Sequence, residues 1–237
     1  MQEQKSSFPF SMIERMMPLY PAIAVMGWMF VLIAFLVGWF VLSPALAAFF
    51  SDGKAVREGA LIGSTFVSAN LSSHVLEAWL PQFKFFGLGL ALLAIVMALG
   101  TIAKRLRSMG QVVFSQLPED MRPSIPAPPK QVKLFQISAM MGIMVLLVVL
   151  VVGIVLGVGV VSDYWNHSIA NELNPAQAGS VLLSQLSVIG SYFYWLNPLR
   201  MVGMAFLFTA ITVALTVIIG TLRMQTKLLN GLVQKAG

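Results

Sequence analysis

Four long stretches of the chain contain no charged residue, and this feature constrains the fold more than any other. They are Ala22–Phe50, Phe85–Ala103, Leu134–Ser162 and Met201–Leu222. About 20 apolar residues in an α-helix are enough to cross a hydrocarbon layer about 30 Å thick. The sequence therefore predicts an all-α integral membrane protein with four transmembrane helices.

Composition supports this fold class and excludes several others. The chain is 58% hydrophobic and only 10% charged, which is too apolar for a soluble globule. The net charge of +6 would favour nucleic acid in a soluble domain, but these cations flank apolar stretches, where they fix topology. We expect no nucleic-acid partner. The absence of cysteine excludes disulfides, thiolate metal sites and cysteine nucleophiles.

The second and fourth stretches belong to an internal repeat with a shift of 116 residues. The aligned pairs include Trp79 with Trp195, Lys84 with Arg200, Gly87 with Gly203, Ala94 with Ala210, Ala98 with Ala214 and Arg107 with Arg223; upstream, Gly63 aligns with Gly179. Because each copy of the repeat contains two spans, the second copy enters the membrane in the same direction as the first. The sequence thus predicts two parallel-repeat helical hairpins related by a pseudo-two-fold axis along the membrane normal.

This arrangement divides the chain into five parts. We expect an N-terminal segment at 1–21 with a short interfacial helix, a first hairpin at 22–107, a Pro-rich linker at 108–133, a second hairpin at 134–223 and a C-terminal tail at 224–237. Pro81 is expected in the first turn of the second span, where a missing N–H costs little. The residues of 51–78 and 163–193 are expected to form the two outer connections.

The distribution of lysine and arginine predicts the orientation. Eleven cations fall on one side of the four spans and four on the other: Lys5, Arg15, Lys104, Arg105, Arg107, Arg122, Lys130, Lys133, Arg223, Lys227 and Lys235, against Lys54, Arg57, Lys84 and Arg200. Cytoplasmic loops carry the excess of positive charge. We therefore expect a multi-pass protein of a bacterial inner or intracytoplasmic membrane, with both termini and the linker in the cytoplasm.

Small residues four positions apart predict where the helices pack, because they let backbones approach in lipid. Each span supplies one such pair: Ala34 and Gly38, Ala94 and Ala98, Gly153 and Gly157, Ala210 and Ala214. Since the second and fourth pairs align in the repeat, helices two and four are expected at the central axis. The alternative is that alanine and glycine are simply common in membrane helices.

Lys84 and Arg200 are the candidate binding residues, because each is expected at the outer start of a span. A cation there opposes the helix dipole at a cost of about 0.3 to 1 kcal/mol, so a negative partner should lie nearby. One reading gives each cation a lipid phosphate. The other gives them an anionic substrate or a carboxylate of a partner subunit.

Two tryptophans and two histidines complete the candidate residues. Trp79 and Trp195 are expected to be interfacial anchors, since indole suits both lipid and water. His74 and His167 fall in the outer connections and could hold a metal together with Asp52, Glu77, Asp163 or Glu172. No metal-ligand spacing such as His-x-x-x-His accompanies them, so no metal or other cofactor is predicted and polar surface is the preferred reading.

The predicted spans carry no ionisable residue in their middle, and this absence shapes the functional hypotheses. Proton relays, ion pathways and coupled transporters normally need such groups at membrane depth. The first hypothesis is a non-catalytic scaffold or accessory subunit that packs with lipids and with other membrane subunits or copies of itself. The alternatives are a channel or transporter for an anionic or apolar solute that uses Lys84 and Arg200, and an outer-face metal or redox enzyme subunit that uses His74 and His167.

Overall fold

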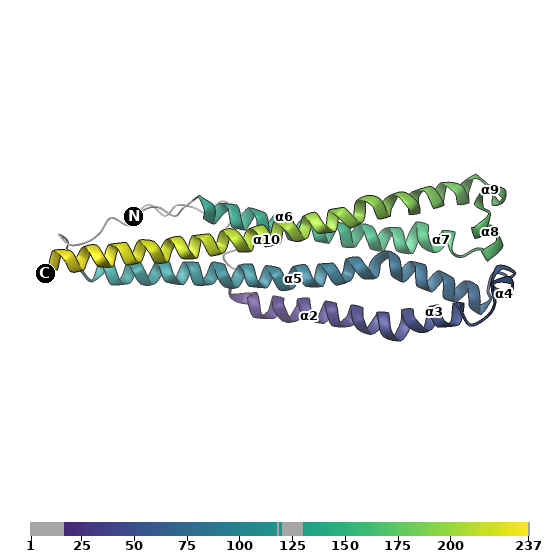
Figure 1. The fold of residues 1–237 in the computed structure, drawn as a ribbon, viewed down its shortest axis with the longest axis horizontal. Helices are drawn as coiled ribbons and strands as arrows, with labels where there is room; N and C mark the ends of the chain where they lie inside the picture. Colours follow the sequence, from purple (N-terminus) through teal and green to yellow (C-terminus); the bar gives the residue numbers. More distant parts are fainter. Residues whose placement is uncertain (1–16, 118, 120–129, 237) are drawn as a thin grey trace. The chain divides into compact units, whose positions relative to one another are not determined.

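The computed structural model describes residues 17–117, 119 and 130–236, and almost all of them are helical (Figure 1). No strand occurs within these ranges. Four helical stretches are long and apolar enough to cross a membrane: Met17–Phe49, Thr65–Ser115, Gln131–Tyr164 and Val181–Gly231. The expectation of an all-helical chain with four long apolar helices is confirmed. Most of the predicted interfacial helix and the proline-rich part of the linker lie outside the described residues.

The first half of the chain contains two long helical stretches. They are built from η1 (Met17–Leu19), α2 (Tyr20–Val37), the π-helical segment η2 (Gly38–Leu42), α3 (Ser43–Phe49), α4 (Lys54–Glu58) and α5 (Thr65–Ser115). The second half repeats this order with α6 (Gln131–Leu156), the π-helical segment η4 (Gly157–Val161), α7 (Ser162–Tyr164), α8 (Ile169–Leu173), α9 (Pro175–Ala178) and α10 (Ser180–Ala236). In both halves a π-helical segment interrupts the first long stretch and an uninterrupted helix forms the second.

The helices that contain the second and fourth charge-free stretches begin earlier than expected, because α5 begins at Thr65 and α10 at Ser180. At 1.5 Å per residue, the 51 residues of α5 would extend about 75 Å. Segments read as outer connections are therefore helical from Thr65 and from Ser180 onward, and α10 continues through the expected tail. These segments were expected to be connections because they contain charged residues and lie outside the apolar stretches, but a helix stabilised by tertiary packing can continue through such residues.

The two prolines of these helices also lie deeper than expected. Pro81 is inside α5 and Pro198 is inside α10, whereas a first-turn position was expected for Pro81. A proline in a helix interior removes one backbone hydrogen bond to the residue four positions earlier. The carbonyl groups of Glu77 and Tyr194 consequently lack their usual partner.

The described residues form two compact units. The loop unit comprises residues 26–89 and 143–204, and the terminal unit comprises residues 17–25, 90–142 and 205–236, apart from the gaps given above. Each unit contains part of α5, α6 and α10. Because each unit has its own buried apolar core, each is described separately below.

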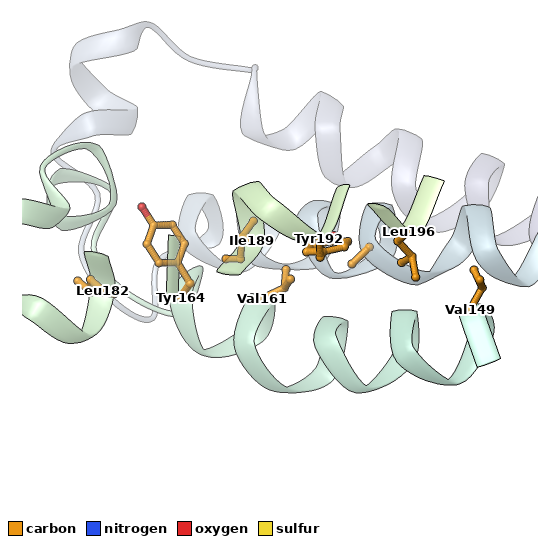
Figure 2. Packing of buried hydrophobic residues seen from close by; sticks show 8 residues of the cluster. Val149, Val161, Tyr164, Leu182, Ile189, Tyr192 and Leu196 are labelled. Atoms are coloured by element: carbon orange, nitrogen blue, oxygen red, sulfur yellow. The ribbon is translucent and has the colours of Figure 1, made fainter. Parts of the chain in front are cut away.

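The core of the loop unit brings together α5, α6, η4, α7 and α10 (Figure 2). Its buried residues are Ala78, Val149, Val161, Tyr164, Leu182, Ile189, Tyr192 and Leu196. The side chains of Tyr164 and Tyr192 are almost fully buried, and Ala78 presents no more than a methyl group to its neighbours. Two large aromatic side chains and smaller aliphatic ones therefore share one buried cluster, which is how close-packed interiors are filled.

The core of the terminal unit is smaller and contains more alanine. Its buried members are Met17, Val96, Phe135, Ala139, Ala210 and Ala214. Two hydrogen bonds between helices accompany it: the Ser138 hydroxyl of α6 donates to the main-chain oxygen of Phe206 in α10 at 2.8 Å, and the Gln225 amide of α10 donates to that of Leu106 in α5 at 2.8 Å. The ends of α5 and α10 in this unit are therefore neighbours.

Two glycines with left-handed backbone angles precede α5 and α10. Gly63 has φ 85° and Gly179 has φ 119°, a region that residues with a Cβ rarely adopt. A Cβ at either position would have no heavy atom within 4 Å, so only backbone strain opposes a side chain. These turns therefore require glycine for conformation and not for space.

We expect Gly179→Ala to lower the free energy of unfolding by about 1 kcal/mol or more, because alanine must adopt a strained backbone. Gly190→Ala is the matched control, since Gly190 is in the helical part of α10 and a Cβ there also meets nothing within 4 Å. The control should be neutral or stabilising. Thermal unfolding in detergent measures both variants, and equal melting temperatures would contradict the prediction.

Candidate functional site

The structure places Lys84 and Arg200 in helix interiors and not at helix starts. Lys84 is the twentieth residue of α5 and Arg200 the twenty-first of α10. The helix dipole acts within the first turn only, so the dipole argument for an anionic partner does not apply to either cation. Their surroundings must be considered instead.

These two cations have different surroundings, although their positions are equivalent in the repeat. The Arg200 guanidinium lies 4.5 Å from the centre of the Phe85 ring, and its Nε is buried without a hydrogen-bond partner. A cation over an aromatic face is stabilised by the ring quadrupole. Lys84 is exposed and lines a groove. Arg200 is therefore held mainly by packing, while Lys84 is free to meet a ligand.

The groove next to Lys84 has a volume of about 550 Å³ and lies between α5 and the stretch from α2 to α3. Its walls are mainly apolar, formed by Val31, Ala34, Phe35, Gly38, Trp39, Leu42, Leu80 and Pro81. The polar groups that line it belong to Ser43, Glu77 and Lys84. We call it the α5 groove. The α5 groove combines an apolar wall with one carboxylate, that of Glu77, and one ammonium group, that of Lys84.

His74 connects the α5 groove to the connection that precedes α8. Its ring is stacked on Trp165 with centroids 3.8 Å apart and an interplanar angle of 14°. Its Nδ1 lies 3.5 Å from Oε2 of Glu77, one turn further along α5. This contact holds the Glu77 side chain on the groove side of α5.

Glu172 in α8 is a buried carboxylate that the sequence offered only as a possible metal ligand beside the histidines. It is only 6% exposed, and its Oε2 accepts a 2.9 Å hydrogen bond from the Asn70 amide of α5. The main-chain N–H of His167 also donates to this carboxylate, while Oε1 is buried without a partner. Burial raises the pKa of Glu172 from its ordinary value of 4.5 to about 7, although both hydrogen bonds lower it.

Tyr164 fixes the backbone that carries this carboxylate. Its hydroxyl donates to the main-chain oxygen of Glu172 at 2.9 Å, and its own main-chain oxygen lies 3.2 Å from Nδ1 of His167. Asn70, Tyr164, His167 and Glu172 form what we call the Glu172 cluster. These contacts attach the connection between α7 and α10 to α5, over 102 residues of sequence.

The two histidines show no metal-binding arrangement. In the described part of the chain, no group of three or more His, Cys, Asp or Glu side chains is close enough to hold a metal ion. His74 stacks on an indole ring, and His167 contacts a main-chain carbonyl oxygen. Their contacts are those of residues that pack a connection against a helix.

Trp79 and Trp195 lie on the flanks of their helices. Trp79 is half-buried and meets Phe83 edge to face at 5.6 Å, while Trp195 is 47% exposed. Both indoles therefore present part of an aromatic face outside the protein. Whether a membrane interface meets them stays a prediction.

Most of the small residues proposed for packing lie at helix contacts. Ala34, Ala94, Ala210 and Ala214 are buried, Ala98 is half-buried, and Gly38, Gly153 and Gly157 each face a neighbouring helix. A Cβ at Gly153 would lie 2.7 Å from Cγ of Gln82 in α5, and one at Gly157 would lie 3.3 Å from Cβ of Ala78. The approach of α6 and η4 to α5 therefore depends on these two glycines.

The closest approach in the loop unit involves a glycine that sequence reasoning did not assign to packing. A Cβ at Gly87 would lie 2.6 Å from Cβ of Phe30 and 2.9 Å from the main-chain oxygen of Gly27. Gly87 has Ala91 four positions further on, so this pair and the alignment of Gly87 with Gly203 in the repeat were two usable signals. Comparison of the chain with protein-family models, curated proteins and solved structures gives no match.

Proposed function

We propose that the chain is a non-catalytic integral membrane subunit, a scaffold or accessory component that packs with lipids and with other membrane subunits or copies of itself. The observation that carries this proposal is the separation of polar groups from the apolar helix middles. The four charge-free stretches hold no ionisable side chain. Leu196 in the loop unit, and Leu207 and Ala210 in the terminal unit, are each 0% exposed. A helical protein with a tightly packed apolar interior is better suited to a structural role in a complex than to ion conduction or proton transfer.

The exposed faces of the long helices support a role in membrane assembly. Large apolar side chains are exposed along α2 and η2, including Trp28 at 69%, Trp39 at 63% and Phe40 at 69%. A face of this kind requires lipid or another apolar helix as its surroundings. The exposed apolar face of α2 and η2 would therefore contact lipids and the helices of other subunits.

Matched features of the two halves support the proposed pair of parallel hairpin repeats. The glycines with positive φ, Gly63 and Gly179, are equivalent under the 116-residue shift. Each half also has one π-helical segment, at Gly38–Leu42 and at Gly157–Val161, and one proline inside its second long helix. The π-helical segments are 119 residues apart and the prolines 117, close to the shift of 116, as duplication of one hairpin followed by small changes would leave them.

Mass measurement of the particle after gentle detergent extraction tests the proposed function. We expect a particle whose protein mass exceeds the 25.8 kDa of one chain, and identification of its contents would name the partner. A monodisperse single chain under several mild detergents would contradict the proposal.

The proposed orientation can be tested by single cysteines, because the chain contains none. We expect cysteines at Ser51 and Asn174 to react with a membrane-impermeant maleimide on intact cells. Cysteines at Ser115 and Thr226 should react only after the membrane is opened. Labelling of all four positions from outside, or of none, would contradict a placement with both termini in the cytoplasm.

A further inference from the structure

We propose that the α5 groove is a binding site for one phospholipid with an ethanolamine headgroup, with its phosphate on Lys84 and its ammonium on Glu77. This inference rests on the proposed membrane placement and adds a ligand to it. The occupant is chosen by three observations: the position of Lys84 relative to the apolar stretch of α5, the order of groups along the groove, and the two opposite charges.

Lys84 lies where the charge-free stretch of α5 ends. Phe85–Ala103 separates it from Lys104, and these residues extend about 30 Å at 1.5 Å per residue. Lys84 is thus at the depth of lipid phosphates in one leaflet, with its ammonium group exposed beside the groove. An exposed lysine at this depth pairs readily with phosphate.

The order of groups along the groove matches the order of groups in a phospholipid. Val31 lies deeper than Lys84, because its main-chain nitrogen would be 3.1 Å from a Cβ at Gly87, and with Ala34 and Phe35 it gives the groove an apolar wall that suits an acyl chain. Glu77 is two helical turns from Lys84 in the direction away from the membrane middle, on the same face of α5 because seven residues make about two turns. A lipid that enters with its tail first therefore presents phosphate to Lys84 and its headgroup amine to Glu77.

The pair of opposite charges selects the headgroup. A primary ammonium group can donate hydrogen bonds to the Glu77 carboxylate and to its main-chain oxygen, which has no usual helical partner because Pro81 has no N–H. Choline has no N–H to donate, and the glycerol group of phosphatidylglycerol is uncharged, so its hydroxyls offer the carboxylate only neutral hydrogen bonds, which are weaker than those from an ammonium group. His74 contacts only one oxygen of Glu77 in the structure, so the carboxylate retains capacity to accept.

Native mass spectrometry of the full-length chain with added lipids tests the site. Phosphatidylethanolamine, phosphatidylglycerol and phosphatidylcholine with identical acyl chains are the probes. We expect about tenfold stronger retention of phosphatidylethanolamine than of the other two lipids. A factor of about ten in affinity is what one additional charge-assisted hydrogen bond contributes. Lys84→Gln should lower its retention about tenfold, and Glu77→Gln should abolish the preference over phosphatidylglycerol.

Two further variants separate the groove from a general charge effect. Gly38→Leu fills the groove and keeps both charges, because a Cβ at Gly38 is 3.9 Å from Leu80 and is tolerated; it should abolish retention. Lys54→Gln with Glu58→Gln removes a matched exposed pair on α4, 3.4 Å apart and outside the groove, and should change nothing. Melting temperatures confirm that each variant is folded.

Several results would overturn the proposed site. The first is equal retention of the three lipids by the unmodified chain. The second is a loss of lipid retention in the α4 control equal to that in Lys84→Gln. The third is that Gly38→Leu releases a bound second protein chain while lipid retention stays unchanged. A lone chain that retains phosphatidylethanolamine selectively would contradict the scaffold function and leave the lipid site standing. A larger assembly without lipid preference would do the reverse.

Discussion

Gly87→Leu is expected to destabilise the loop unit more than any other single substitution considered for this chain. A Cβ at Gly87 would lie 2.6 Å from Cβ of Phe30, 2.9 Å from the main-chain oxygen of Gly27 and 3.1 Å from the main-chain nitrogen of Val31. Two of these atoms belong to the backbone of α2, so no rotamer change can make room. Overpacking costs about 1–3 kcal/mol when side chains can move, and we expect about 3 kcal/mol or more here.

Gly220→Leu provides the matched control for this prediction. Gly220 is in the apolar part of α10, and a Cβ there meets nothing within 4 Å. Thermal unfolding in detergent and the yield of monodisperse protein should fall sharply for Gly87→Leu and stay near the unmodified value for Gly220→Leu. Comparable stability of the two variants would show that α2 is not held against α5 at this point.

The sequence predicted the helical class from one physical quantity, the length of its charge-free stretches. Transfer of charge into an apolar layer is costly enough that residues such as Lys104 and Arg223 limit these stretches clearly. The same signal does not mark helix ends. The charge-free stretch in α5 begins at Phe85, whereas the helix itself begins at Thr65. The polar residues between these two positions are compatible with a helix that continues beyond the apolar stretch.

Contacts of the candidate site depend on distances that no local pattern contains. Asn70 and Glu172 are separated by 102 residues, and neither has a neighbour in sequence that indicates a buried pair. The α5 groove likewise requires knowledge that Val31 and Lys84 line the same groove. Lys84 could be selected from the sequence because its charge is unusual among apolar neighbours, but Glu77 resembled an ordinary residue of a connection.

Glu172→Gln should flatten the pH dependence of stability and stabilise the chain above pH 7. Burial raises the pKa of Glu172 from 4.5 to about 7, so the folded state binds a proton more tightly than the unfolded state between these values. The free energy of unfolding is then highest below about pH 4.5, falls as pH rises to about 7 and remains lower above it. Allowing for partial solvent screening, we expect a loss of about 2 kcal/mol across this range.

Glutamine keeps the contacts of Glu172 while removing its charge, which is why the variant isolates the carboxylate. Its amide oxygen can still accept from the Asn70 amide and from the His167 N–H, as the carboxylate does. Glu58→Gln is the control, because Glu58 is an exposed carboxylate that contacts Lys54 at 3.4 Å. Melting temperatures from pH 4 to pH 8 should decline for the unmodified chain and for Glu58→Gln but not for Glu172→Gln. Parallel curves for all three proteins would mean that Glu172 is hydrated in the folded state, and the connection between α7 and α10 would then have to open away from α5.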